Sequence, residues 1–205
     1  SYTSSVSANT TAGFSIVSYT ADGGSSASFG HGLSQAPELV ICKNRSAAYG
    51  WATYNAISGA DYTLYLNTTA AVASDSNTFP DAPSSTVVNL GASSAANGRP
   101  SNTDSMIAYC WHSVEGYSKV GGYTGNGSTD GSFVYTGFKP AFIMFKNTTA
   151  TGNWVIVDSK RDTYNEINKT LWADLTSAEG TYQWGDFTSN GFKFRNTSNG
   201  LNNSG

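Results

Sequence analysis

The feature that most constrains the fold of this chain is an internal repeat. Residues 19–55 read YTADGGSSASFGHGLSQAPELVICKNRSAAYGWATYN, and residues 123–158 read YTGNGSTDGSFVYTGFKPAFIMFKNTTATGNWVIVD. From the proline to the tryptophan of each copy, 37–51 and 140–154, the two stretches align without a gap, offset by about a hundred residues. This period exceeds that of solenoids and propellers. The repeat predicts either a duplicated half-domain or two small tandem domains.

The composition favours β-structure over helix. Charged residues make up 12% of the chain, about half the usual share of a soluble domain, and aromatic residues make up 13%. Gly, Ser, Thr and Asn fill much of the rest, which suits short strands joined by polar turns. The sequence therefore predicts an all-β protein, a β-sandwich of the jelly-roll or concanavalin-like type built from two homologous halves.

The repeat also suggests how the chain is divided. Residues 1–12 are polar and form a linker or an edge strand, 13–118 the first half and 119–205 the second. The joining segment is too short and too aromatic for a flexible linker, so we expect the halves to pack as one unit. Between residues 70 and 102 we expect mostly loop. Strands are expected at 14–19, 28–30, 39–43, 51–54, 62–66, 86–90, 106–112, 132–135, 141–146, 154–158, 170–174 and 192–194.

The second half lacks one strand of the first. In the first half Asn97-Gly98 is soon followed by the apolar run 106–112, whereas after the matching Asn199-Gly200 the sequence ends at Gly205 without such a run. We therefore expect an open sheet edge, which is a template for pairing with another strand. Either the polypeptide continues beyond Gly205 or a neighbouring chain donates the strand.

Bulk properties argue against some partners. The net charge of −3 gives no basic surface for nucleic acid. The sequence contains no run of eighteen apolar residues, which a transmembrane helix would need. No phosphate-binding Gly-rich loop ending in Lys-Ser/Thr is present, so we predict no cofactor. Cys42 and Cys110 each lie in an apolar strand-like run, and the sequence leaves open whether they form a disulfide or stay as buried thiols.

Catalytic signatures are weak. A glycan-degrading enzyme would use two carboxylates, and the candidates are Asp158, Asp162 and Glu166. Lys160 and Arg161 lie between them, however, as in a solvated turn with internal ion pairs. His31 and His112 stand without a nucleophile-elbow motif or a zinc-ligand spacing, so packing or surface roles are expected for both. We predict no catalytic residues and no enzyme activity.

A polar loop offers the one weak candidate for a metal site. Asn126, Ser128 and Asp130 cluster oxygen atoms as a calcium loop does, but the alternating carboxylates and the closing Glu of such loops are missing. A plain turn between strands is the simpler interpretation, so we predict no metal.

Aromatic side chains exceed what a single core requires, and aromatic faces beside polar groups can bind sugars. The candidate glycan-binding residues are Trp172, Trp184, Tyr182 and Asp162. The alternative is that the rings fill the core of a sandwich.

Four stretches of the chain resemble a known domain: GHGLSQAPELVICKNRS, VEGYSKVGGYTGNGSTDGSFVYTGFKPAFIMFKN, WVIVDSKRDTYN and SNGFKFRNTS. Together they are similar to an uncharacterised β-rich domain of tail-fibre-like and other virion structural proteins of tailed bacteriophages, marine and cyanobacterial phages above all. The resemblance spans residues 14–203. It implies a structural or adhesive module on the virion surface and assigns no catalytic residues.

The predicted function is therefore that of a phage virion fibre, decoration or adhesion module. Its partners would be copies of itself or other virion proteins, together with host-surface glycan. A carbohydrate-binding, lectin-like module is the alternative, and a glycan-degrading enzyme is the third possibility.

Overall fold

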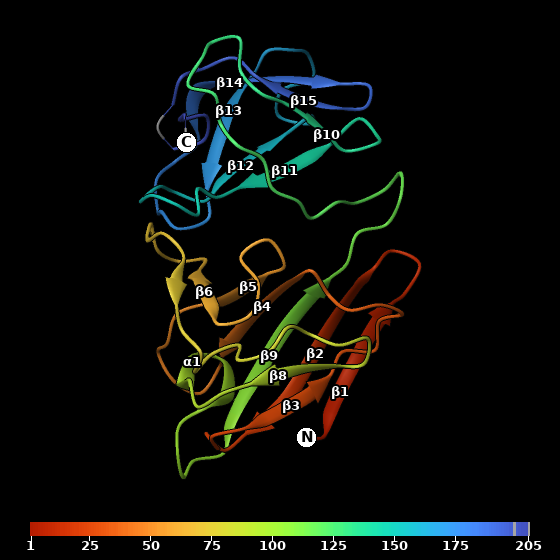
Figure 1. The fold of residues 1–205 in the computed structure, drawn as a ribbon, viewed down its shortest axis with the longest axis vertical. Helices are drawn as coiled ribbons and strands as arrows, with labels where there is room; N and C mark the ends of the chain where they lie inside the picture. Colours follow the sequence, from red (N-terminus) through yellow and green to blue (C-terminus); the bar gives the residue numbers. More distant parts are fainter. Residues whose placement is uncertain (199, 205) are drawn as a thin grey trace. The chain divides into compact units, whose positions relative to one another are not determined.

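Almost all regular structure in this protein is β-strand (Figure 1). The computed structural model describes residues 1–198 and 200–204. Every strand pairing in it is antiparallel, and the single α-helix, α1 (Ser94–Asn97), is four residues long. Within the described part of the chain no helix has the length and apolarity needed to cross a bilayer. The predicted all-β fold is confirmed.

The chain divides into two compact units, each with its own hydrophobic core. The division after Gly121 lies close to the predicted boundary after 118. Residues 67–71 lie in the first half of the sequence but belong to the second unit, where the Thr69 carbonyl accepts hydrogen bonds from the Gly152 N–H (2.8 Å) and the Lys146 ammonium (3.1 Å). Unit 1 comprises residues 1–66 and 72–121, and unit 2 comprises 67–71 and 122–205.

A seven-stranded sheet in the order β1-β2-β9-β4-β5-β6-β7 forms one layer of unit 1. Its long central strands, β2 (Phe14–Ala21) and β9 (Asp104–Trp111), bury every second residue because only one face of the sheet covers the core. β1 (Ser4–Asn9) pairs with β2 as an edge strand within the segment 1–12. The other strands are β4 (Leu39–Asn44), β5 (Ala52–Asn55), β6 (Tyr62–Tyr65) and β7 (Ala73–Ser74).

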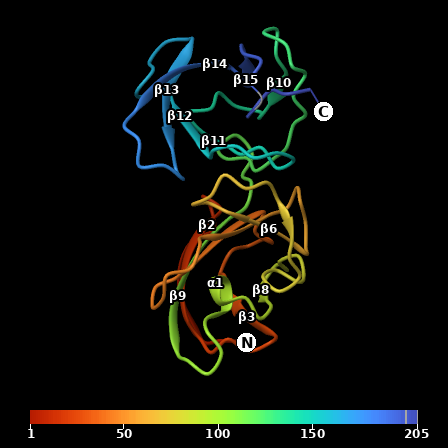
Figure 2. The same ribbon diagram turned by 90° about the vertical axis from the view of Figure 1, so that its left-hand side faces the viewer.

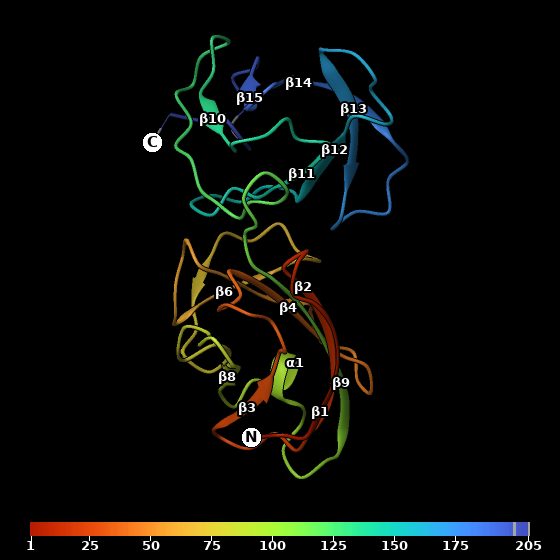
Figure 3. The same cartoon turned by 90° about the vertical axis from the view of Figure 1, so that its right-hand side faces the viewer.

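The second layer of unit 1 is a small two-stranded sheet, β3 (Ala27–Gly30) and β8 (Val87–Leu90), together with α1. Figures 2 and 3 show this layer across from β2 and β9. Rings and aliphatic side chains from both layers fill the space between them, as in a β-sandwich. The fully buried core residues include Val17, Phe29, Val40, Phe79, Val88, Met106 and Ala108.

Unit 2 is a single six-stranded sheet in the order β10-β15-β14-β13-β12-β11. The sheet curls so that its ends face each other across the core (Figure 3). The Phe145 ring of β11 accordingly lies 5.3 Å and 5.4 Å from the rings of Phe192 and Phe194 on β15, although three strands separate β11 from β15 in the sheet. The strands are β10 (Phe133–Tyr135), β11 (Phe142–Phe145), β12 (Val155–Asp158), β13 (Ile167–Trp172), β14 (Gly180–Thr188) and β15 (Gly191–Phe194).

The sequence pattern did not predict strand β14. Its first residues are exposed on both faces, and two neighbouring residues, Trp184 and Gly185, are both buried, so the strand shows no regular alternation. The register with β13 shifts in the same region, between Ile167 and Lys169. Because such irregularity hides the two-residue period, the pattern of β14 does not look like a strand.

The two repeated stretches form hairpins of the same register. β4 and β5 pair Leu39 with Asn55, and β11 and β12 pair Phe142 with Asp158. Both residues are displaced by 103 (142 − 39 and 158 − 55). The turn after the first strand of each hairpin is also the same. The Asn44 side-chain oxygen accepts the backbone N–H groups two and three residues later, and the Asn147 side-chain oxygen does so in the second hairpin.

A tyrosine and an asparagine hold the same loops together in both units. The Tyr19 hydroxyl donates to the Ala96 carbonyl (2.5 Å), and the Tyr123 hydroxyl donates to that of Leu201 (2.7 Å). The backbone N–H of a glycine then donates to the neighbouring asparagine: Gly23 to Asn97 (2.8 Å), and Gly127 to Asn202 (2.7 Å). The predicted partner of Asn97, Asn199, lies outside the described residues, and Asn202 makes the equivalent bonds. Descent of the two units from one ancestor stays a prediction.

Candidate functional site

The strongest candidate for an interaction surface is the pair of open edges of the unit 2 sheet. β10 and β11 are its terminal strands, so each has one unpaired side within the sheet. Each edge carries an exposed aromatic side chain, Phe133 on β10 (47% exposed) and Phe142 on β11 (59% exposed). Edge strands of this kind are usually shielded by charge, proline or a covering segment. Within the described residues, β11 is a terminal strand of mostly apolar residues.

The β11 edge corresponds to a position that is filled in unit 1. β4 is the strand equivalent to β11, and it pairs with β5 on one side and with β9 on the other. Among the residues that the structure describes, β11 pairs with β12 alone. The inward-facing side chain of Val40 on β4 is completely buried, whereas its equivalent on β11, Ile143, is only partly buried. The strand in unit 2 that is equivalent to β4 is therefore less completely buried than β4 itself.

Two of the predicted glycan-binding rings belong to the core of unit 2. Trp184 is 6% exposed, and its indole N–H donates to the Thr170 hydroxyl. Trp172 is partly buried and packs against the same core. For Trp184 the alternative given by the sequence, that the ring fills the core, agrees with its burial, because the curled sheet places β14 with this side chain facing inward.

Tyr182 remains exposed. Its ring is 51% exposed and stacks on that of Trp184, with 5.0 Å between ring centroids. A shallow, mostly polar cleft adjoins it, lined also by Asn196, Thr197, Ser198 and Gly200. The Asn196 side chain is fixed by bonds to the Gln183 carbonyl (2.6 Å) and the Ser198 N–H (2.9 Å). A fixed ring beside amide and hydroxyl groups has the chemistry to stack against and hydrogen-bond a sugar.

Asp162 has a structural role. One of its carboxylate oxygens accepts the backbone N–H groups of Asn168 (2.8 Å) and Lys169 (2.5 Å), which anchors the start of β13. The structure does not bring Asp162 to the Tyr182 cleft, which other residues line.

The acidic cluster is also tied into local bonds. Asp158 accepts from the Arg161 side chain (2.6 Å), and Glu166 accepts from that of Gln183 (2.8 Å). Burial opposes ionisation of Asp158, but the N–H groups and charge of Arg161 outweigh burial and lower the pKa of the carboxyl. Neither the Tyr182 cleft nor the core cavity of unit 2 is lined by Asp158, Asp162 or Glu166.

The loop proposed as a weak metal site is held by internal hydrogen bonds. The Asn126 amide donates to the Asp130 carbonyl (3.0 Å), and the Ser128 N–H donates to the Asn126 side chain (3.1 Å). The Asp130 carboxylate pairs with Lys193 at 2.7 Å, which lowers the pKa of Asp130. Among the residues that the structure describes, no three His, Cys, Asp or Glu side chains gather as metal ligands.

Both histidines are buried, as the packing interpretation expects. The Nδ1 atom of His31 accepts the Leu33 N–H (3.1 Å), and its Nε2 atom lies 3.2 Å from the Ser84 carbonyl. One nitrogen accepts and the other donates, which requires the neutral ring. Burial also lowers the pKa of His31. His112 bonds the Ser113 carbonyl through Nδ1 (2.8 Å).

Both cysteines are free and buried, although they lie on the neighbouring strands β4 and β9. Burial raises the pKa of Cys42 to about 12 and raises that of Cys110 even further. Because the thiolate is the reactive form, neither thiol in the native protein is expected to react with a thiol-specific dye at about pH 8. Both are expected to react after unfolding in guanidinium, which serves as the control. Rapid labelling of the native protein would contradict the burial.

Comparisons with known proteins place the chain in one family. No curated protein and no solved structure matches it. A family model described as a domain of unknown function, DUF7483, matches residues 1–205, the whole of the sequence. The chain therefore belongs to the DUF7483 family.

Proposed function

We propose that this domain is a structural module on the surface of a tailed-bacteriophage virion, where it assembles with copies of itself or with other virion proteins. The observation that supports the proposal best is the pair of open, aromatic-bearing edges of the unit 2 sheet, β10 and β11. Such edges bind other chains by adding strands, with main-chain hydrogen bonds for affinity and apolar side chains for fit. The sequence resemblance to virion structural domains supports the same proposal.

The assembly proposal predicts self-association that depends on these edges. Light scattering is expected to give a mass above that of one chain at roughly 100 µM protein, in the affinity range of weak, small interfaces. Replacing Phe133 on the β10 edge by lysine is expected to shift the mass toward that of a single chain, because a lysine on an edge strand opposes pairing.

Tyr164→Lys is the matched control, because Tyr164 is 85% exposed and lies outside the strands. It should leave the mass unchanged. A single-chain mass for the unmodified protein at every concentration would overturn self-assembly.

A second candidate function, recognition of host-surface glycan, is favoured by the cleft beside Tyr182. On a glycan array Tyr182→Ala is expected to lose at least tenfold in apparent affinity, because stacking on an aromatic face supplies much of the binding energy in a shallow polar site. Tyr182→Phe, which retains the ring, should keep most of the binding, and Tyr164→Ala should keep all of it. Equal binding by the Tyr182→Ala variant would remove this site from consideration.

A further inference from the structure

We propose that the open edge of β11 is an acceptor for one extended strand with the side-chain pattern of β9, donated from outside the described residues. This inference rests on the proposed function and deepens it, because it names the kind of segment that one of the two edges takes.

The position of β9 in unit 1 shows where a strand added to β11 would lie. It pairs antiparallel with β4 from Leu39↔Trp111 to Asn44↔Met106. The β4–β5 hairpin has the same register as β11–β12, displaced by 103 residues. A strand added to β11 in the same register would therefore run antiparallel to Phe142–Phe145 and complete the arrangement that unit 1 already has.

The backbone groups of β11 are oriented so that they can pair with an added strand. The Ser159 N–H donates to the Ala141 carbonyl (2.9 Å), as the Ala56 N–H does to the Glu38 carbonyl in unit 1 (2.8 Å). Because hydrogen-bonded pairs alternate along an antiparallel ladder, the groups of residues 143 and 145 point to β12. Those of Phe142 and Met144 point to the open side. The N–H and C=O groups of Phe142 and Met144 can therefore hydrogen-bond the backbone of an added strand.

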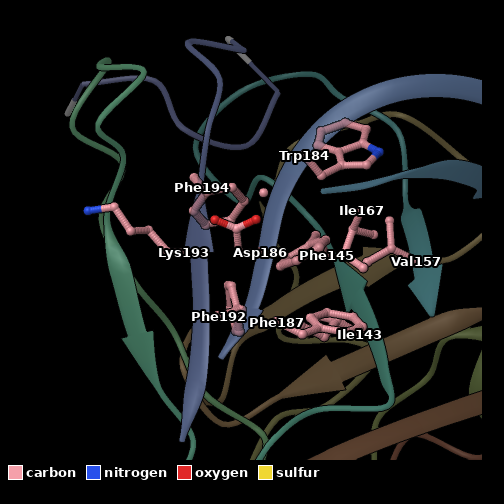
Figure 4. A pocket seen from close by; sticks show the side chains of 11 residues that line it. Ile143, Phe145, Val157, Ile167, Trp184, Asp186, Phe187, Phe192, Lys193 and Phe194 are labelled. Carbon is pink, nitrogen blue, oxygen red and sulfur yellow. The ribbon is translucent and has the colours of Figure 1, made fainter. Parts of the chain in front are cut away.

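The core of unit 2 is less completely covered at β11 than the core of unit 1 is at β4, since Ile143 is partly buried and Val40 completely buried. The inward side chains of β9, namely Met106, Ala108 and Cys110, are completely buried in unit 1. No described strand of unit 2 takes this place, and Ile143 of β11 lines a small apolar gap of about 10 Å³, the size of one water molecule (Figure 4). Its other walls include Phe145, Val157, Phe187 and Phe192. Inward apolar side chains of a donated strand would extend this core.

The donor is not one of the strands described here. β2 and β9 alone among the described strands alternate fully buried and more exposed residues over eight positions. Both are already paired on both sides, β2 with β1 and β9, and β9 with β2 and β4. A second copy of the chain therefore has no suitable strand to spare, and the occupant is a partner segment with alternating apolar side chains.

The test is titration of the 205-residue protein with a synthetic peptide of the β9 region, residues 102–113 with Cys110→Ala. We expect saturable 1:1 binding by calorimetry. We also expect slowed hydrogen exchange at the Phe142 and Met144 amides, and no such change on β4. A peptide of scrambled order should not bind at roughly 1 mM, and a peptide N-methylated on the amides that face β11 should bind at least tenfold more weakly.

A matched pair of variants separates edge pairing from side-chain packing. Met144→Pro removes the N–H group on the open side, where proline is tolerated in an edge strand, and should weaken peptide binding at least tenfold. Met144→Leu retains the N–H group and should bind as the unmodified protein does. Thermal unfolding checks that both variants fold, and the N-methylated peptide provides the same test without altering the protein.

Three results would overturn the inference: absence of peptide binding, binding that is insensitive to both the proline and the N-methyl groups, or strong protection of the Phe142 and Met144 amides before any peptide is added. Self-association that persists when the peptide fails to bind would leave the proposed function standing without this inference. Peptide binding by a chain that never self-associates would support this inference and contradict self-assembly.

Discussion

Replacing Trp184 by alanine is expected to destabilise unit 2 by about 3–5 kcal/mol. The indole lies in the core and is almost completely buried, so the substitution removes its apolar contacts and leaves a cavity among phenylalanine rings. It also removes the indole N–H that donates to the buried Thr170 hydroxyl. Hydrogen exchange of the β14 and β15 amides measures the effect on unit 2 separately from unit 1.

Tyr182→Ala is the matched control for this prediction. Its ring stacks on Trp184 but is half exposed, so its loss is expected to cost under about 1 kcal/mol. If Trp184→Ala left hydrogen exchange unchanged while glycan binding fell, Trp184 would be a binding residue after all and the curled sheet described here would be wrong.

Replacing Asp104 by asparagine is expected to destabilise unit 1 by about 2–3 kcal/mol. The carboxylate is inaccessible to solvent and accepts the Arg99 side chain (2.7 Å), the Arg99 backbone N–H (2.9 Å) and the Asn44 amide (2.8 Å). An asparagine amide would bring a donor against these donors. The cost stays below that of a fully buried pair because the Arg99 side chain is 39% exposed and can turn toward water. Chemical denaturation measures it.

The same substitution has a predictable pH dependence. Hydrogen bonds from Arg99 hold the pKa of Asp104 far below its usual value despite burial. Below about pH 4 the unfolded chain therefore binds a proton that the folded chain does not, so stability falls as the pH falls. The stability difference between the unmodified protein and Asp104→Asn is expected to shrink between about pH 5 and pH 2.

Asp130→Asn is the control for both measurements. Asp130 also pairs with a cation, Lys193, but its side chain is 84% exposed, so solvent screens the pair and the substitution should leave stability unchanged within error. An Asp104→Asn variant as stable as this control at neutral pH would contradict the buried network.

The repeat was readable in the sequence because it resides in short, local patterns. Prolines, the Lys-Asn turn and a run of apolar residues define each hairpin, and hairpin register follows from such local features. Short-range pairing needs only neighbouring residues, so a single sequence carries enough information to locate it.

The side chains of the candidate site were harder to place. Trp184 and Tyr182 are two residues apart on β14 and look alike in the sequence, yet one ring is buried and the other half exposed. Asp162 looked available for a sugar, but it anchors the backbone of β13. These outcomes depend on contacts between residues distant in the chain, for which local alternation gives no signal.

The sequence by itself determined the strand class, most strand positions and the recurrence of one hairpin plan. Those properties follow from composition and from a two-residue period within each strand. Only the tertiary structure decided which rings form the core, because burial depends on what lies across the sheet. In unit 2 the sheet curls and brings β15 opposite β11, and this determines which rings are buried. The curl arises from twist and packing accumulated over all six strands.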